Sequence, residues 1–93
     1  MSVGIAKIEL SIDYVRTLKE KRSIIQPLIV KIRNNYNVSI AELDGIDEKN
    51  RAILGIAHIS QNGSLSNKKI SKIITEIEKS SQVMLVNYSL EII

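Results

Sequence analysis

The residues of this sequence best suited to chemistry are basic side chains concentrated in one short segment. Six of them lie between residues 16 and 34, accompanied by a single acid, Glu20; they are Arg16, Lys19, Lys21, Arg22, Lys31 and Arg33. This segment has a net charge of +5, whereas the whole chain has +3, so the remaining residues sum to −2. Lysine and arginine bind phosphate groups without regard to base sequence, and salt weakens that binding. The segment therefore predicts a surface for an anionic partner, with structured RNA or a ribosomal particle as first choice. The alternative is an ordinary solvated helix face.

A lone histidine and an acidic loop are the other candidates for chemistry. His58 lies among apolar neighbours, where a packed and hydrogen-bonded imidazole is commoner than a catalytic base or a metal ligand. Asp44, Asp47 and Glu48 lack the spacing of a calcium-binding loop, so turn formation and solubility explain them more simply. No glycine-rich phosphate loop is present. We therefore expect no enzyme, no cofactor and no metal site, and the sequence identifies no small-molecule ligand.

The composition predicts one ordered domain over residues 1–93. Hydrophobic residues make up 44% and charged residues 25%, as in an average soluble domain, and the absence of cysteine excludes disulfides and thiolate metal sites. Lys7 and Glu9 interrupt the apolar residues near the N-terminus, and no apolar segment is long enough to cross a membrane. We expect a cytoplasmic protein without membrane association.

Alternation of apolar and polar residues predicts four strands. They cover residues 3–12, 38–43, 51–60 and 82–93. The 51–60 segment is apolar on both faces, which predicts a central position in the sheet. In the last strand, the alternation places Val86, Tyr88, Leu90 and Ile92 on one face.

Apolar residues at helical spacing predict two helices. The first begins near Leu18 with Thr17 as N-cap, and Asn34, Asn35 and Asn37 mark its C-terminal end. Pro27 predicts either a kink or a separate main segment that begins near Gln26. The second helix covers residues 67–80, with Ser66 as its cap. Its isoleucines form one face and its lysines the opposite face, the latter being Lys68, Lys69, Lys72 and Lys79.

This order of elements, strand, helix, strand, strand, helix, strand, predicts an α+β, ferredoxin-like split βαβ sandwich (βαββαβ). Both helices would cover one face of a four-stranded antiparallel sheet. On the other face we expect some uncovered apolar surface, formed by Ile5, Ile53 or Leu54, Ile59 and Leu85. Such patches usually mark association, which predicts a homodimer through this face or an edge strand. A homo-oligomeric protein-interaction or regulatory domain is thus the alternative to nucleic-acid binding.

Several short segments resemble one known family. They are LKEKR at residues 18–22, RN at 33–34, NVSIAE at 37–42, RA at 51–52 and LGIA at 54–57. Over essentially the whole chain, this pattern resembles the YlxP-like proteins, a family of small bacterial proteins of unknown function. The resemblance implies a ferredoxin-like fold, no established enzymatic activity, and genes often found among those for translation initiation and ribosome maturation.

Stacking of RNA bases on the sheet is not expected. The chain has no Phe or Trp, and Tyr14, Tyr36 and Tyr88 lie outside the predicted central strands. Contacts to nucleic acid would therefore be made to phosphates, or to the shape of a folded RNA.

Overall fold

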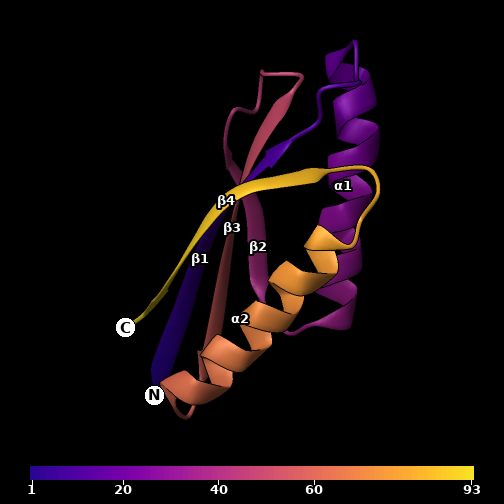
Figure 1. The fold of residues 1–93 in the computed structure, drawn as a ribbon. Helices are drawn as coiled ribbons and strands as arrows, with labels where there is room; N and C mark the ends of the chain where they lie inside the picture. The colour runs from indigo at the N-terminus through magenta and orange to yellow at the C-terminus, as the bar shows by residue number, and fades with distance from the viewer.

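The computed structural model describes residues 1–93 as a four-stranded sheet with two helices (Figure 1). The elements are β1 (Ser2–Ser11), α1 (Leu18–Asn35), β2 (Ser39–Asp44), β3 (Arg51–Ser60), α2 (Gly63–Glu78) and β4 (Met84–Ile92). The strand order is β2-β3-β1-β4 and every neighbouring pair is antiparallel. Both helices lie on one face of the sheet. The predicted ferredoxin-like βαββαβ fold is confirmed.

β1 and β3 are the central strands, and β2 covers only part of β3. They pair along their full length, from Ser2 opposite Ser60 to Ser11 opposite Arg51. β2 is shorter, and its first residue, Ser39, lies opposite Ala57. The last three residues of β3 therefore extend beyond β2.

The core lies between the sheet and the helices. One cluster of 17 buried hydrophobic residues includes Ile8 of β1, Leu54 of β3, Ile32 of α1 and Ile73 of α2. Isoleucine dominates this cluster because β-branched side chains suit strands, and isoleucines at helical spacing give each helix an apolar face. Neither helix is long and apolar enough to cross a membrane.

α1 passes through Pro27 as one helix, so the expectation of a separate segment beginning near Gln26 is wrong. Proline cannot donate the hydrogen bond that the carbonyl of Ser23 would accept within a regular helix. Ser23 and Pro27 are both exposed, so water can solvate that carbonyl. The predicted N-cap is confirmed: the hydroxyl of Thr17 accepts a hydrogen bond from the backbone N–H of Glu20 at 3.1 Å.

α2 begins earlier than predicted, and Ser66 is not its cap. The side-chain oxygen of Asn62 accepts a hydrogen bond from the backbone N–H of Leu65 at 3.0 Å, so Asn62 is the N-cap. Ser66 lies inside the helix, fully buried against the end of β3. The residues from Gly63 to Ser66 thus form the first turn of the helix instead of a loop.

A β-bulge in β4 changes which face of the sheet the first residues of this strand occupy, compared with the prediction. Glu9 of β1 lies opposite Asn87, but the next residue, Leu10, lies opposite Leu85, so Val86 is an extra residue. The bulge interrupts the alternation, which turns Leu85 toward the core and leaves Val86 exposed. The prediction that Leu85 lies on the uncovered face is therefore wrong.

The sheet face away from the helices, here called the bare face, keeps the other predicted apolar residues. Ile5 and Ile59 are 40% and 61% exposed. Of the two alternatives in β3, Leu54 belongs to the core and Ile53 to the bare face, where its neighbours leave it only 3% exposed. An exposed apolar patch is thus present, centred on Ile5 and Ile59.

Candidate nucleic-acid interface

The loop between β1 and α1 is held in place by hydrogen bonds from distant segments. The side-chain amide of Asn50 donates to the carbonyls of Ile12 and Val15 at 2.9 and 3.0 Å. The hydroxyl of Tyr14 donates to the carbonyl of Gln82 at 2.8 Å. These contacts fix the path of the chain into α1 and so position the residue that follows, Arg16.

Arg16, Lys19 and Arg22, here called the N-terminal basic group, are exposed at the start of α1. None of them belongs to any of the ion pairs in the molecule. Lys19 and Arg22 are three residues apart, which makes them neighbours on the helix surface. The group therefore offers three positive charges, none paired with an acid, at one end of α1.

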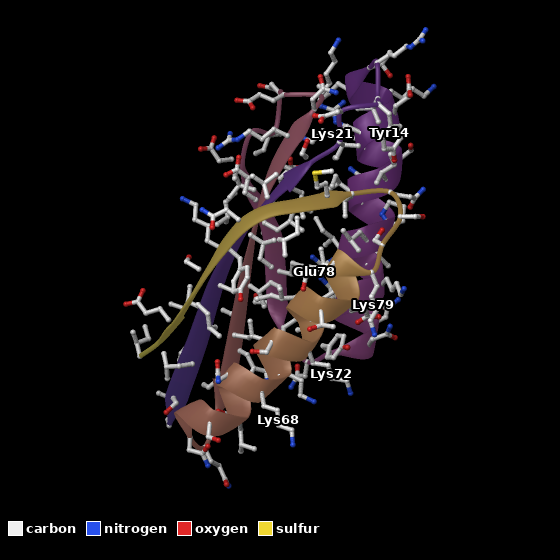
Figure 2. The ribbon with its side chains drawn as sticks, in the orientation of Figure 1. Tyr14, Lys21, Lys68, Lys72, Glu78 and Lys79 are labelled. Atoms are coloured by element: carbon white, nitrogen blue, oxygen red, sulfur yellow. The ribbon has the colours of Figure 1, made fainter.

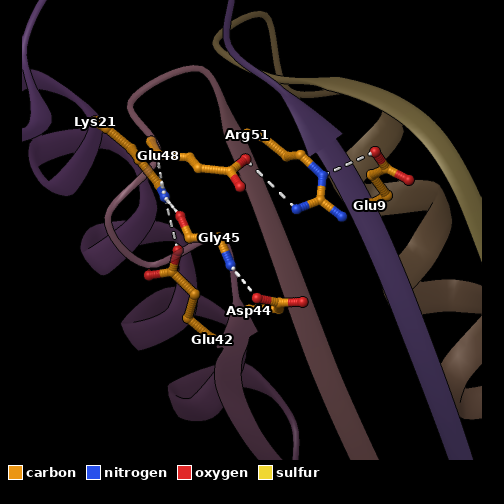
Figure 3. A network of polar contacts seen from close by, with 7 residues as sticks. All are labelled: Glu9, Lys21, Glu42, Asp44, Gly45, Glu48 and Arg51. Carbon is orange, nitrogen blue, oxygen red and sulfur yellow. Dashed lines mark hydrogen bonds and ion pairs between the residues drawn. The ribbon is translucent and has the colours of Figure 1, made fainter.

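Lys21 lies in the same turn but points inward, and it is only 1% exposed (Figure 3). Its ammonium group donates hydrogen bonds to the carbonyl of Gly45 at 2.6 Å and to that of Glu48 at 2.7 Å. It also forms an ion pair with Glu42 Oε2 at 2.8 Å, although this oxygen accepts no hydrogen bond of good geometry. The structure thus removes Lys21 from the predicted phosphate-binding set and gives it a structural role, which ties α1 to β2 and the loop that follows.

The two basic residues in the second half of α1 are exposed, but each has one polar partner within the protein. Lys31 lies on the side toward α2, with its Nζ 3.8 Å from Glu76 Oε1. Arg33 is exposed and donates one hydrogen bond, from Nη2 to the carbonyl of Ile40 at 3.0 Å. A guanidinium group has five N–H donors, so most of those on Arg33 stay free for another partner. Arg22 and Arg33 are about three helical turns apart, which places them on the same side of α1 at a spacing of about 16 Å.

The acidic loop has structural contacts. Asp44 accepts a hydrogen bond from the backbone N–H of Gly45 at 2.8 Å, and Gly45 adopts a positive φ of 69°. Arg51 lies between Glu9 and Glu48, at 3.2 and 3.5 Å. The hydrogen bond to Glu9 is the main reason that the pKa of Arg51 is raised. No three or more His, Asp or Glu side chains gather where they could hold a metal ion.

Further positive charge lies on α2, outside the predicted set. Lys68, Lys69 and Lys72 are exposed and unpaired, and Figure 2 shows Lys68, Lys72 and Lys79 following one another along α2. Lys69 Nζ lies 5.9 Å from the centre of the Tyr36 ring, a cation–π distance. The pKa of Tyr36 is raised, first by a hydrogen bond to Glu76 and then by burial and the charge of Glu76.

The two helices together define the most basic surface of the molecule. α1 and α2, with Lys79 at the end of α2, are here called the helix layer; they contain nine basic and three acidic residues, a net charge of +6 that includes the buried Lys21. All other residues together carry −3. Lys68 and Lys72 are four residues apart, a spacing that places them on one side of α2, as the three-residue spacing places Lys19 and Arg22 on one side of α1. This spacing is the sequence signal that the lysines of α2 belong to the basic surface.

This architecture defines a small ferredoxin-like protein with a basic helix layer, and comparison with known proteins gives its family. Residues 3–90 match the family described as "Protein of unknown function (DUF503)", and the chain belongs to it. It is 28% identical to the "Uncharacterized protein YlxP" of Bacillus subtilis (strain 168), over 81 residues that cover 87% of this chain and 88% of that protein. The predicted resemblance to the YlxP-like proteins is confirmed, and neither description names an activity or a partner.

Proposed function

We propose that this protein is a non-enzymatic binding module that docks on the phosphates of structured RNA or of a ribosomal particle in the cytoplasm. The observation that supports the proposal is the N-terminal basic group: three exposed cationic side chains without acidic partners at the start of α1, next to a helix layer of net charge +6. Arg33 extends the contact along α1. Unpaired charges favour this function because a phosphate does not have to displace an internal ion pair.

The first test is binding of the purified protein to structured RNA and to small ribosomal subunits. We expect saturable binding at low salt and much weaker binding of the variant R16Q/K19Q/R22Q, because each removed cation takes away one phosphate contact. K7Q is the control, since Lys7 is an exposed lysine on β1, outside the helix layer. The proposal is contradicted if the protein does not bind at low salt, or if the single variants R22Q and K7Q lose RNA affinity equally.

The second candidate function is self-association through the bare face, as a homodimer that serves protein interaction or regulation. The exposed pair Ile5 and Ile59, on adjacent central strands, favours it. The same face carries both Lys7 and Glu91, and a surface with both signs of charge can pair with its own copy across a two-fold axis.

Light scattering over a range of protein concentrations tests this candidate. A dimer that persists in high salt and becomes a monomer in the variant I5K/I59K would support it, because apolar contacts depend little on salt. A wild-type protein that stays monomeric at high concentration would exclude it.

A further inference from the structure

A groove lies at the opposite end of the helix layer from the N-terminal basic group. β3 extends beyond β2 there, and α1 has already ended at Asn35, so no helix covers this part of the sheet except α2. The groove has a volume of about 380 Å³, and its lining residues are His58, Ser60, Leu65, Lys68, Lys69 and Lys72. This volume lies within the range of ordinary ligand sites.

The wall formed by β3 is fixed by a buried hydroxyl. Ser66 Oγ lies 2.9 Å from His58 Nδ1 and 2.7 Å from Ser60 Oγ, and it donates to the carbonyl of His58 at 3.1 Å. Ser66 is itself fully buried. Ser66 Oγ thus contacts the imidazole ring and the Ser60 hydroxyl at the same time. The imidazole ring and the Ser60 hydroxyl are therefore held in place before any ligand arrives.

The wall formed by α2 supplies charge. Lys68 and Lys72 are one turn apart, so they project from the same side of the helix, as Figure 2 shows. Lys69 is adjacent and is steadied by the Tyr36 ring. None of the three is in an ion pair, and no acidic residue lines the groove. A concave surface that carries charge of one sign concentrates ions of the opposite sign.

We propose that this groove binds the phosphate groups of a nucleotide. Lysine ammonium groups bind phosphates as point charges, and three of them suit a chain of adjacent phosphates better than a single one. Leu65, the alkyl stems of the lysines and the fixed His58 ring give the groove an apolar floor, against which a base can lie. This site is separate from the N-terminal basic group and does not depend on the RNA binding proposed above.

His58 is the only histidine, so the NMR signals of its ring report directly on the groove. Titration with ADP is the test, with adenosine and pyrophosphate as partial ligands. We expect saturable shifts of the His58 signals with ADP, weaker binding of pyrophosphate, and no shift with adenosine alone. The variant K68Q/K72Q should bind ADP at least about tenfold more weakly, because it loses charge-assisted hydrogen bonds.

Two variants control for charge elsewhere. K79Q removes a lysine from the end of the same helix but outside the groove, and R22Q alters the N-terminal basic group; both should keep wild-type affinity for ADP. The proposal is overturned if ADP does not shift the His58 signals, if K68Q/K72Q binds as the wild type does, or if adenosine shifts them as strongly as ADP.

A last comparison distinguishes a free nucleotide from the end of an RNA chain as the source of the phosphates. A short RNA with a 5′-phosphate that displaces ADP, while the same RNA with a 5′-hydroxyl does not, would assign the groove to RNA ends. Displacement by neither RNA would assign it to free nucleotides. Failure of ADP to bind, together with salt-sensitive binding of RNA to α1, would contradict only the groove.

Discussion

The helix layer and the bare face of the sheet differ in how their arginines and lysines are paired. On the bare face, Arg51 lies between Glu9 and Glu48, so its charge is largely neutralised within the protein. At the helix layer, by contrast, the N-terminal basic group and the lysines of the groove beside α2 have no acidic partner. Their apolar residues differ as well, because the bare face exposes Ile5 and Ile59 whereas the helices cover the core isoleucines. Unpaired cations favour an anionic partner, and exposed isoleucines favour an apolar one.

A similar contrast exists within one turn of α1. Lys21 is buried and has polar partners on β2 and the loop that follows, while its neighbour Arg22 is exposed and unpaired. Adjacent residues of the same charge thus have different roles, one in stability and one available for binding.

The largest effect is expected at Lys21. The change K21A leaves the Glu42 carboxylate without its counter-ion and the carbonyls of Gly45 and Glu48 without their donor. Loss of one member of a buried ion pair costs about 3–5 kcal/mol of the free energy of unfolding. Chemical denaturation measures this, and R22A should change the free energy of unfolding by no more than about 0.5 kcal/mol. Equal effects of the two changes would show that Lys21 is not a structural residue.

Truncation of isoleucines on the two faces should have unequal effects. I73A creates a cavity in the core, where Ile73 is fully buried, and should cost about 2–5 kcal/mol. I59A removes a side chain that is 61% exposed and should cost less than about 1 kcal/mol in the monomer. The free energy of unfolding at low protein concentration is the measurement. A large loss for I59A there would mean that the bare face is covered in a way that the structure does not show.

A smaller effect tests where α2 begins, on which the groove depends because the first turn of the helix carries Leu65 and Ser66. N62A removes the N-cap and should lower the free energy of unfolding by about 1 kcal/mol. N67A is the matched control, since Asn67 is exposed within the helix and its side chain makes no hydrogen bond. If N67A costs as much as N62A, the cap is assigned to the wrong residue.

Hydrophobic periodicity predicted nearly all of the fold. The alternation in the strands, the helical spacing of the isoleucines and the capping box at Thr17 are local signals, and the structure confirms each element they indicated. The errors arose where one local sequence pattern is compatible with two different structures. The Asn62–Gly63 pair reads as a turn, but Asn62 caps a helix instead, and the bulge at Val86 cannot be distinguished from continued alternation.

The candidate interface was less predictable because it depends on distant pairings. The partners of Lys21 at Gly45 and Glu48 lie 24 and 27 residues away, and helical spacing shows only that the side chain points inward. The groove beside α2 exists because β3 extends past β2, and how far it extends depends on the register in which the two strands pair. The positive charge is visible in the sequence, but only the fold decides which cations stay free.

The salt dependence of RNA binding tests the central claim most directly. We would measure the affinity for one structured RNA over a range of salt concentrations, for the wild type and for R16Q/K19Q/R22Q. If the N-terminal basic group contacts phosphates, the slope of log affinity against log salt should be shallower in the variant by about 2–3, close to one unit for each lost contact. An unchanged slope would show that these cations do not contact RNA, and would contradict the account.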